Sequence, residues 1–448
     1  MGRGAQNDTP SARPMLAPED AWIGSLDHDA FGKDIRELGD RLIANQGAAD
    51  FRHLQRIVLA SNCFCVAGVA TMWVGGLWWT AFSAVCLSTW TFSRWTMIAH
   101  HTCHGGYDRV GSKRYNRFRF AVNGLLRRIQ DWFDWMLPEA WNVEHNNMHH
   151  YSLGEVNDPD LVEQNLRALR NQRAPLPLKY MQAFLVMFFW KWTYYAPNTY
   201  KELKLAQMRR AGRELPPHLR HLDPRASVTV MDVLKAKGAF WFSMQELTTN
   251  VIGPYLLFHF FVLPAPLLLL PGQGTTYFCN AVLTLFLAEL LTNAHSFAVI
   301  VNNHAGDDLY RFSTSVRPKS GSFYLRQVIS SVNFGTGCPF TGAICGPLAD
   351  ANDFLHGWLN FQIEHHLWPS ASMLTYQRAA PLVRAICEKH GVPYVQQSFA
   401  WRVYKTMQIM VGTRSMRKFP AAYEHAPDQV STARSTIQAE GGVAFSDS

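Results

Sequence analysis

Two long stretches of this chain contain no charged side chain. The first covers residues 57–93, which is 37 residues, and the second covers residues 247–288, which is 42 residues. A helix that spans a membrane needs about 20 apolar residues, so each stretch is long enough for two spans. Gly75-Gly76 interrupts the first stretch and Pro271-Gly272 interrupts the second. The pattern predicts four transmembrane helices in two hairpins, at about residues 57–74, 78–99, 251–270 and 276–301.

A third apolar stretch, residues 181–195, is shorter than a span and contains Lys191. It is rich in aromatic side chains, which concentrate where lipid meets water. We interpret this stretch as an interfacial helix that lies along the membrane surface.

The charge balance indicates which side of the membrane the polar segments occupy. The whole chain has 42 Lys and Arg against 34 Asp and Glu, a net charge of +8, and residues 101–250 have 21 against 14. Because basic loops stay on the cytoplasmic side, we expect the N-terminus, residues 101–250 and the C-terminus there. The predicted fold is an all-α integral membrane protein with a cytoplasmic helical cap. The membrane explains the basic charge, so no nucleic-acid partner is expected.

The two ends of the chain differ in composition from its centre. Residues 1–50 and 411–448 are polar, and their outermost parts are rich in Pro, Ala, Ser and Gln, so we expect both ends to be partly disordered. The first 20 residues lack the apolar run of a signal peptide. The predicted organisation is one membrane domain, residues 51–410, between two polar ends.

The histidines gather in three clusters next to the predicted spans. In the first two clusters a pair of histidines is separated by three residues, which places both rings on one face of a helix. Two further histidines stand at the end of the fourth predicted span. The clusters are His100, His101 and His104; His145, His149 and His150; and His365 and His366, with Gln362 before them; the further pair is His295 and His304.

The predicted topology places all these histidines on one side of the membrane, at the same depth. Neutral imidazoles are good ligands for iron, zinc and copper, and an imidazole buried near the bilayer without a partner is costly. Eight to ten histidines exceed what one metal ion can bind, so we expect two ions. Nearby carboxylates are expected to orient the rings; they are Asp108, Glu144, Asp158, Asp160 and Glu364.

These residues resemble the histidine-box signature of the membrane fatty acid desaturases, which is H-x3-H, then H-x2or3-H-H, then H-or-Q-x2or3-H-H. The resemblance extends over about residues 57–410 and is most specific at Asn360–Pro369. That segment closely follows the third box of the front-end acyl desaturases, in which Gln replaces the first His, as Gln362 does here. Asn303-His304 is similar to the segment after the fourth span that completes the metal site in this family.

The resemblance implies that two non-haem iron ions bind in the cytoplasmic cap. The implied ligands are His100, His104, His145, His149, His150, His304, His365 and His366, and His101, His295 and Gln362 are additional candidates. It implies no catalytic side chain beyond the iron ligands.

The resemblance also implies a membrane desaturase that uses O2 to introduce a C=C bond into an acyl chain. The acyl chain would be carried as an acyl lipid or an acyl-CoA. The sequence has no His-Pro-Gly-Gly motif of a fused cytochrome b5 domain. Electrons are therefore expected from a separate protein, either ferredoxin or cytochrome b5 with its reductase.

Two departures from the front-end pattern leave the double-bond position and the donor open. His101 stands where that branch commonly has Asp, and three residues rather than two separate His145 from His149. Related di-iron hydroxylases and ketolases of lipids or carotenoids have the same boxes and are the main alternative. A zinc hydrolase needs about three histidines and an open position, and this chain has far more histidines than that. A non-catalytic metal transporter is expected to have ionisable residues within its spans, whereas the histidine clusters here stand next to the predicted spans.

A run of basic residues follows the first box directly. It contains Arg109, Lys113, Arg114, Arg117 and Arg119. The simplest interpretation is that this run anchors the chain on the cytoplasmic side. The same charge can instead bind lipid phosphate, coenzyme A or an acidic electron donor.

Overall fold

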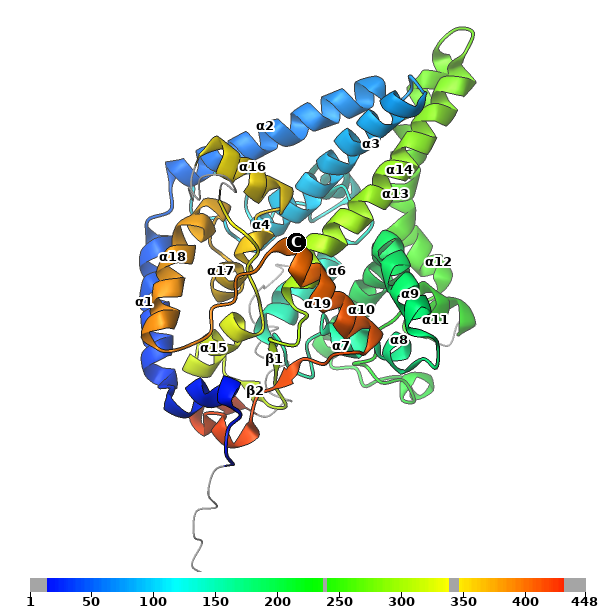
Figure 1. Cartoon of the computed structure of the whole chain (residues 1–448). Coiled ribbons are helices and arrows are strands. Elements are labelled where there is room, and N and C mark those ends of the chain that lie inside the picture. Colours follow the sequence, from blue (N-terminus) through cyan, green and yellow to red (C-terminus); the bar gives the residue numbers. More distant parts are fainter. Residues whose placement is uncertain (1–13, 237–239, 338–345, 431–448) are drawn as a thin grey trace, which may run out of the picture.

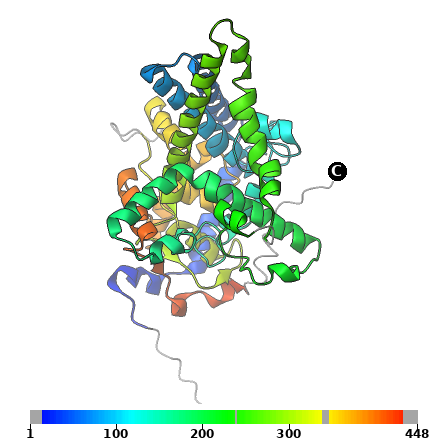
Figure 2. The same ribbon diagram turned by 90° about the vertical axis from the view of Figure 1, so that its right-hand side faces the viewer.

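A computed structural model describes residues 14–236, 240–337 and 346–430 of the chain. Helices make up most of the structure and the strands are short (Figure 1), so the mostly helical character that the sequence predicts is confirmed. Long helices extend from one end of the molecule, and shorter helices and loops form a cap at the other end (Figure 2). Residues 1–13 and 431–448, the outermost parts of the predicted polar ends, lie outside the described residues.

The first uncharged stretch folds into two antiparallel helices, α2 (Ala48–Thr71) and α3 (Leu77–Phe92). Thr71 Oγ1 and Ser83 Oγ lie 2.7 Å apart between the two helices. Gly68 of α2 faces a leucine side chain of α3, and a Cβ atom at this position would come within 2.7 Å of it. The π-helical segment η2 (Ser93–Ala99) then continues α3 towards the cap.

The second uncharged stretch forms a further pair of apolar helices. The first of them, residues Met244–Leu269, contains several local π-helical and 3-10 segments. The second is α14 (Gly274–Ile300), which η11 (Val301–Asn303) extends. Thr292 Oγ1 on α14 donates to Ser88 Oγ on α3 at 3.1 Å, so the two pairs pack against each other. The segments of the first helix are α12 (Met244–Leu247), η8 (Thr248–Ile252), α13 (Gly253–Leu257), η9 (Phe258–Val262) and η10 (Ala265–Leu269).

Within the described residues, three helices are long and apolar enough to cross a membrane: Ala48–Thr71, Met244–Leu269 and Gly274–Asn303. They overlap the first, third and fourth predicted spans. The second predicted span, 78–99, is not among them, because α3 has 16 residues before the π-helical segment begins. Apolar helices able to cross a membrane are thus confirmed, and the arrangement as four spans stays a prediction.

The predicted interfacial helix corresponds to α9 (Leu176–Trp190) followed by the π-helical segment η6 (Lys191–Tyr195). Lys191 points inwards, and its Nζ donates to Asp134 Oδ2 at 2.5 Å with both side chains fully buried. An exposed apolar face beside an internally neutralised cation suits a helix at a lipid boundary, and the interfacial position stays a prediction. The large exposed side chains of α9 are Leu176, Leu178, Met181, Phe184, Leu185 and Phe189.

The cap brings the first and last thirds of the chain together. Helix α1 (His28–Ala44) packs against α15 (Gly321–Ile329) at the point where Gly32 faces Gly321. A Cβ atom on Gly32 would lie 2.6 Å from the Cα atom of Gly321, so the two helices can approach this closely only through glycine.

Two short strand pairs attach the C-terminal segment to the cap. β1 (Tyr310–Arg311) pairs in parallel with β3 (Arg417–Lys418), and β2 (Ser315–Val316) pairs antiparallel with β4 (Gln429–Val430). The described part of the predicted tail, residues 411–430, is therefore tied into the fold.

The remaining helices are mostly short and complete the cap. They are η1 (Pro18–Ser25), α4 (His100–Cys103), α5 (Leu125–Arg127), η3 (Arg128–Trp132), α6 (Pro138–Trp141), η4 (Asn142–Asn146), η5 (His149–Tyr151), α7 (Val162–Asn165), α8 (Arg167–Asn171), α10 (Ala196–Arg210), η7 (Pro217–Leu219), α11 (Val230–Lys235), α16 (Pro347–Leu355), η12 (Leu359–Phe361), α17 (Gln362–Leu367), α18 (Met373–Lys389), α19 (Phe399–Val411), η13 (Ala421–Tyr423) and η14 (Ala426–Asp428).

We expect Lys191→Met to destabilise the protein by about 3–5 kcal/mol, because the substitution leaves the Asp134 carboxylate buried without its cation. The midpoint of thermal unfolding of the detergent-solubilised protein, followed by circular dichroism, measures this effect. Lys191→Met combined with Asp134→Leu removes both charges and is expected to recover most of the lost stability. Equal midpoints for the wild type and Lys191→Met would show that the ion pair does not stabilise the fold.

Candidate metal centre

The eight histidines that the sequence predicts as iron ligands are all buried, and they lie together in the cap. The first cluster lies beyond the end of α3, where η2 leads into α4; His100 begins α4 and His104 follows it directly. The second cluster lies on η4 and η5, and the third lies on α17. His304 follows η11 at the end of α14. Four segments that are distant in sequence therefore converge on one point.

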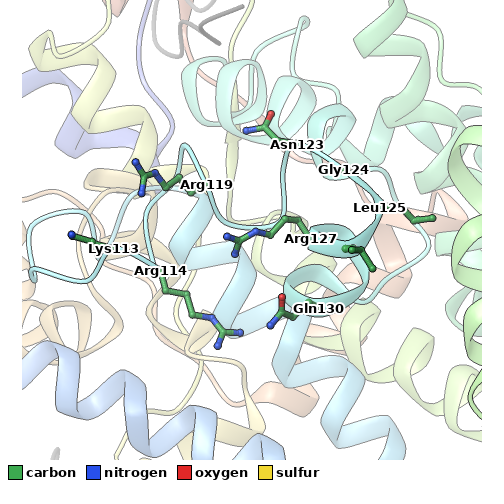
Figure 3. Close-up of a pocket in the computed structure, with 9 residues that line it drawn as sticks. Lys113, Arg114, Arg119, Asn123, Gly124, Leu125, Arg127 and Gln130 are labelled. Atoms are coloured by element: carbon green, nitrogen blue, oxygen red, sulfur yellow. The ribbon is translucent and has the colours of Figure 1, made fainter. Parts of the chain in front are cut away.

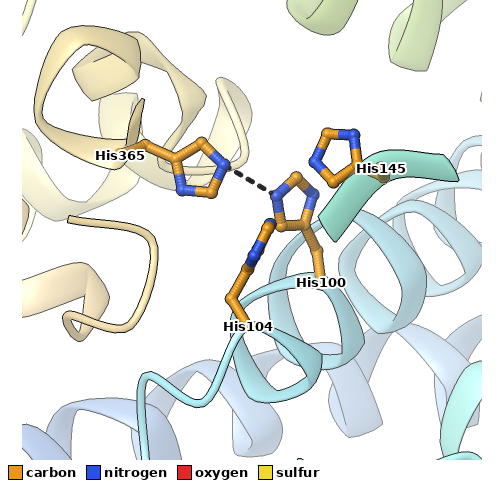
Figure 4. Close-up of side chains that lie close together, drawn as sticks. All are labelled: His100, His104, His145 and His365. Atoms are coloured by element: carbon orange, nitrogen blue, oxygen red, sulfur yellow. Dashed lines mark hydrogen bonds between the residues drawn. The ribbon is translucent and has the colours of Figure 1, made fainter. Parts of the chain in front are cut away.

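The ring nitrogens form two groups. Within each group, one ring nitrogen from every member lies within 4.8 Å of the others. His150 lies between the groups, because its ring centroid is 4.8 Å from that of His145 and 4.3 Å from that of His366. The first group is His100, His104, His145 and His365 (Figure 4), and the second is His149, His304 and His366.

The facing rings need a shared cation or proton. His100 Nε2 lies 3.0 Å from His365 Nε2 (Figure 4), and the second group contains a similar contact of 3.2 Å between ring nitrogens. Each such contact can hold only one hydrogen between two nitrogen atoms. A metal ion in each group would satisfy these nitrogens, so the residues fit two ions of the kind that imidazole binds well, iron included. Further ring nitrogens without a hydrogen-bond partner among the described residues belong to His104, His145 and His150.

Burial keeps most of these imidazoles in the neutral form, which is the form that binds metal. Burial lowers the pKa of His145 to about 4. It also lowers the pKa of His365 and His366, and the neighbouring rings lower both further. For His149 burial acts in the same direction, but Asp158 and a second nearby carboxylate outweigh it and raise the pKa.

Two side chains that sequence reasoning missed hold histidines from outside the cluster. His366 Nδ1 donates to Gln327 Oε1 at 3.2 Å, and His365 Nδ1 lies 3.4 Å from the hydroxyl of Tyr376. A hydrogen bond at Nδ1 fixes the ring orientation and leaves Nε2 for the metal. Gln327 on α15 and Tyr376 on α18 belong to no motif, so only the fold could identify them.

Two of the five predicted orienting carboxylates lie against a histidine. Asp158 Oδ1 accepts a hydrogen bond from His149 Nδ1 at 2.8 Å. Asp160 Oδ2 lies 3.7 Å from His149 Nδ1 and 3.9 Å from His145 Nδ1. Asp158 also accepts from the backbone N–H of Gly154 at 2.9 Å, which holds the carboxylate in place.

The other three carboxylates have different surroundings. Asp108 pairs with Arg117, with Oδ2 and Nε 2.5 Å apart. Glu364 accepts hydrogen bonds from an asparagine and a tyrosine side chain, and burial raises its pKa to about 7. Glu144 is buried, and burial together with Asp160 raises its pKa. Asp108 and Glu364 thus stabilise the segments that carry the boxes rather than the rings themselves.

Of the three additional candidate ligands, one lies beside the histidine groups and two lie outside them. Gln362 Nε2 lies 3.0 Å from His304 Nε2, so Gln362 borders the second group. His101 donates from Nδ1 to a backbone carbonyl of its own helix and belongs to neither group. His295 hydrogen-bonds a backbone carbonyl, and its ring stacks on Phe92 outside both groups.

A largely apolar cavity of about 220 Å³ reaches the histidines. Members of both groups line it, and so do residues of α7, α9, η6 and the end of α14. The cavity therefore places a space suited to a hydrocarbon chain directly against both groups. The histidines that line it are His100, His145, His149 and His304, and its apolar lining includes Val186, Trp190, Phe297, Ile300 and Leu359.

Known proteins resemble this chain over most of its length. The family model of the fatty acid desaturases matches residues 76–398. The NADPH-dependent stearoyl-CoA 9-desaturase of Mycobacterium tuberculosis is 25% identical over 402 residues, covering 85% of this chain and 77% of that protein. The acyl-lipid (7-3)-desaturase of Rebecca salina is 26% identical over 309 residues, 68% of this chain and 57% of that protein. Fatty acid desaturase 3 of Bos taurus is 53% identical over 47 residues, 10% of this chain and 11% of that protein.

Asp158→Asn is expected to weaken metal binding about 10–100-fold, because His149 loses the carboxylate that fixes its Nδ1 proton. Metal retained after dialysis against increasing chelator concentrations, measured by elemental mass spectrometry, tests this. Asp108→Asn is the matched control: Asp108 contacts Arg117 rather than a histidine, so retention should stay within about twofold of the wild type. Identical behaviour of the two variants would contradict the role of Asp158.

Proposed function

Because this chain belongs to the fatty acid desaturase family, we propose that it introduces a C=C bond into an acyl chain at two iron ions held by the histidine cluster. The chain is an oxidoreductase of lipid metabolism. The observation that carries the proposal is that two buried histidine groups border one apolar cavity. A non-catalytic metal-binding protein has no substrate and therefore needs no such cavity.

Each histidine group would hold one iron ion, and His150 would stand between the two. The bound irons would supply the reduction of O2 and the removal of two hydrogens from adjacent methylene carbons, chemistry that no side chain of this protein can perform. Asp158 keeps the His149 ring oriented, and Gln327 and Tyr376 do the same for the third box. The protein's task is to present neutral nitrogens in a fixed arrangement.

The cavity would position the acyl chain. Its apolar walls, with Val186, Trp190 and Phe297, favour methylene groups over water. A chain held there lies against histidines of both groups, which brings one C–C bond within reach of the metal ions.

The acyl chain is proposed to be carried by coenzyme A or by a membrane lipid. One relative is named for stearoyl-CoA and another for acyl lipid. O2 and a separate electron-donor protein, ferredoxin or cytochrome b5 with its reductase, complete the reaction.

We propose that the membrane domain, residues 51–410, crosses the membrane four times in two hairpins. The second span would consist of α3 and η2, which are antiparallel to α2. The convergence of α4 and the end of α14 at the histidine cluster supports one common side for the whole site. The excess of Lys and Arg in residues 101–250 supports the cytoplasmic side for the site and both termini.

His149→Ala and His365→Ala, one in each group, are expected to abolish the unsaturated product while the protein stays in the membrane fraction. Each variant removes one ligand of one iron ion. The test expresses each variant and the wild type in a host with a compatible donor. Total fatty acids are then profiled by gas chromatography–mass spectrometry, with derivatisation to locate the double bond.

His295→Gln is the matched control for these two variants. Its side chain lies outside both groups, and glutamine can keep the hydrogen bond to the backbone carbonyl. This variant is expected to retain most of the activity. Full activity in either alanine variant would contradict the ligand assignment, and a hydroxylated product from the wild type would place the chain among the related hydroxylases.

Val186→Trp is expected to lower the conversion of long acyl chains relative to short ones about tenfold, because the indole fills part of the cavity. Cells supplied with saturated fatty acids of different lengths give the ratio of products. Val66→Trp is the control: it makes the same substitution on α2, where the side chain is 68% exposed. The cavity assignment fails if both variants change the ratio equally or neither does.

A further inference from the structure

A basic pocket lies apart from the histidine cluster, in the segment that joins the first and second boxes. Figure 3 shows its lining side chains, which come from the loop after the first box and from α5 and η3. Its volume is about 870 Å³, and it shares no lining residue with the apolar cavity. The lining residues are Lys113, Arg114, Arg119, Asn123, Gly124, Leu125, Leu126, Arg127 and Gln130, with no acidic side chain among them.

The positive charge of this pocket is only partly balanced. Arg114 and Arg127 share the buried carboxylate of Asp131, at 3.3 Å and 3.4 Å. Lys113 and Arg119 are exposed and make no side-chain hydrogen bond or ion pair with the described residues. Four cations that line one pocket, two of them paired with a single carboxylate, create a potential that attracts an anion.

The pocket is joined to the ends of two apolar helices. The guanidinium of Arg94, in η2, donates to the backbone carbonyl of Gln130. On the other side, Arg128 donates to the carbonyl of Asn250 at 3.0 Å, near the start of the candidate span Met244–Leu269. The pocket therefore lies where those helices end, beside them rather than at the far end of the cap.

Large apolar side chains stand next to the cations. Leu126 is 83% exposed and Leu125 is 54% exposed, and both line the pocket. Phe118 is also exposed, between Arg117 and Arg119. Exposed leucines beside arginines are typical of a surface that enters the boundary between headgroups and acyl chains.

We propose that this pocket binds the phosphate of an anionic membrane lipid, with Leu125 and Leu126 against its acyl chains. Arginine guanidinium groups match phosphate oxygens through paired N–H donors, and lysine adds a point charge. The proposal depends on the membrane placement proposed above, not on the reaction. An acidic protein would explain the cations but not the exposed leucines or the position at the ends of the apolar helices.

The test measures lipid binding by the full chain, purified in a neutral detergent, without any turnover. A failure to bind lipid is therefore separate from a failure of desaturase activity. Native mass spectrometry counts bound phosphatidylglycerol and phosphatidylcholine with identical acyl chains over a series of concentrations. We expect the wild type to prefer phosphatidylglycerol about tenfold or more, and Lys113→Gln/Arg119→Gln to lose this preference. Neither substitution removes a partner from buried Asp131.

Two further variants serve as controls. Arg173→Gln/Arg213→Gln also removes two exposed cations, but elsewhere on the surface, and should keep the lipid preference within about twofold. Leu126→Gln changes no charge and should weaken binding of both lipids to a similar extent. All variants are compared as monodisperse protein.

Several results would overturn the proposal. One is equal binding of the two lipids by the wild type, and another is an unchanged preference in Lys113→Gln/Arg119→Gln. Displacement of phosphatidylglycerol by an equal concentration of inorganic phosphate would identify a soluble phosphate compound as the ligand instead. If Lys113→Gln/Arg119→Gln lost binding to an acidic electron donor but kept the preference for phosphatidylglycerol, the surface would be assigned to a protein partner instead.

Discussion

Eight imidazoles buried at one point, with nitrogens that face one another, are the constraint on which the rest of the fold depends. Such nitrogens are costly where water is excluded, unless an ion or a hydrogen bond satisfies each of them. The fold therefore brings four distant segments together and supplies acceptors from behind. Asp158, Gln327 and Tyr376 each hold one ring by its Nδ1 atom. These three contacts also restrict the orientation of the three rings.

Helix geometry at the site departs from the regular α-helix where the ligands are presented. The π-helical segment η2 comes directly before His100, and η4, also π-helical, contains His145. An extra residue in a turn rotates the following side chains relative to the preceding helix, and such turns are frequent at functional sites. In this protein α3 can thus keep an apolar surface for its neighbours while its continuation directs His100 and His104 into the cap. The apolar helix must pack against its neighbours, whereas the histidines must point into the cap. The π-helical segment between them allows both orientations.

Sequence reasoning predicted those features of the site that spacing alone determines. The pair His100 and His104 lies on one helix face, as the i, i+4 spacing requires. Sequence reasoning could not exclude His101 as a ligand. Adjacent helical side chains differ by about 100° in direction, and only packing decides which one faces the site. Proximity in sequence also failed to distinguish Asp158, which contacts a ring, from Asp108, which pairs with an arginine. At the level of the fold, composition predicted the apolar helices, but it could not reveal that α3 becomes π-helical after 16 residues.

The cavity relates the two histidine groups to the acyl chain on which a desaturase acts. Two histidines from the first group and two from the second line it, whereas His104, His365 and His366 are not among its lining residues. An acyl chain held in this cavity would therefore contact both groups rather than one group alone. Removing hydrogens from two neighbouring carbons requires both carbons to be held near the oxidising site at once, which a cavity lined by both groups would favour. Much of the apolar wall comes from α9 and α14, and both helices also have exposed apolar side chains, so the elements that line the cavity present apolar surface outwards as well.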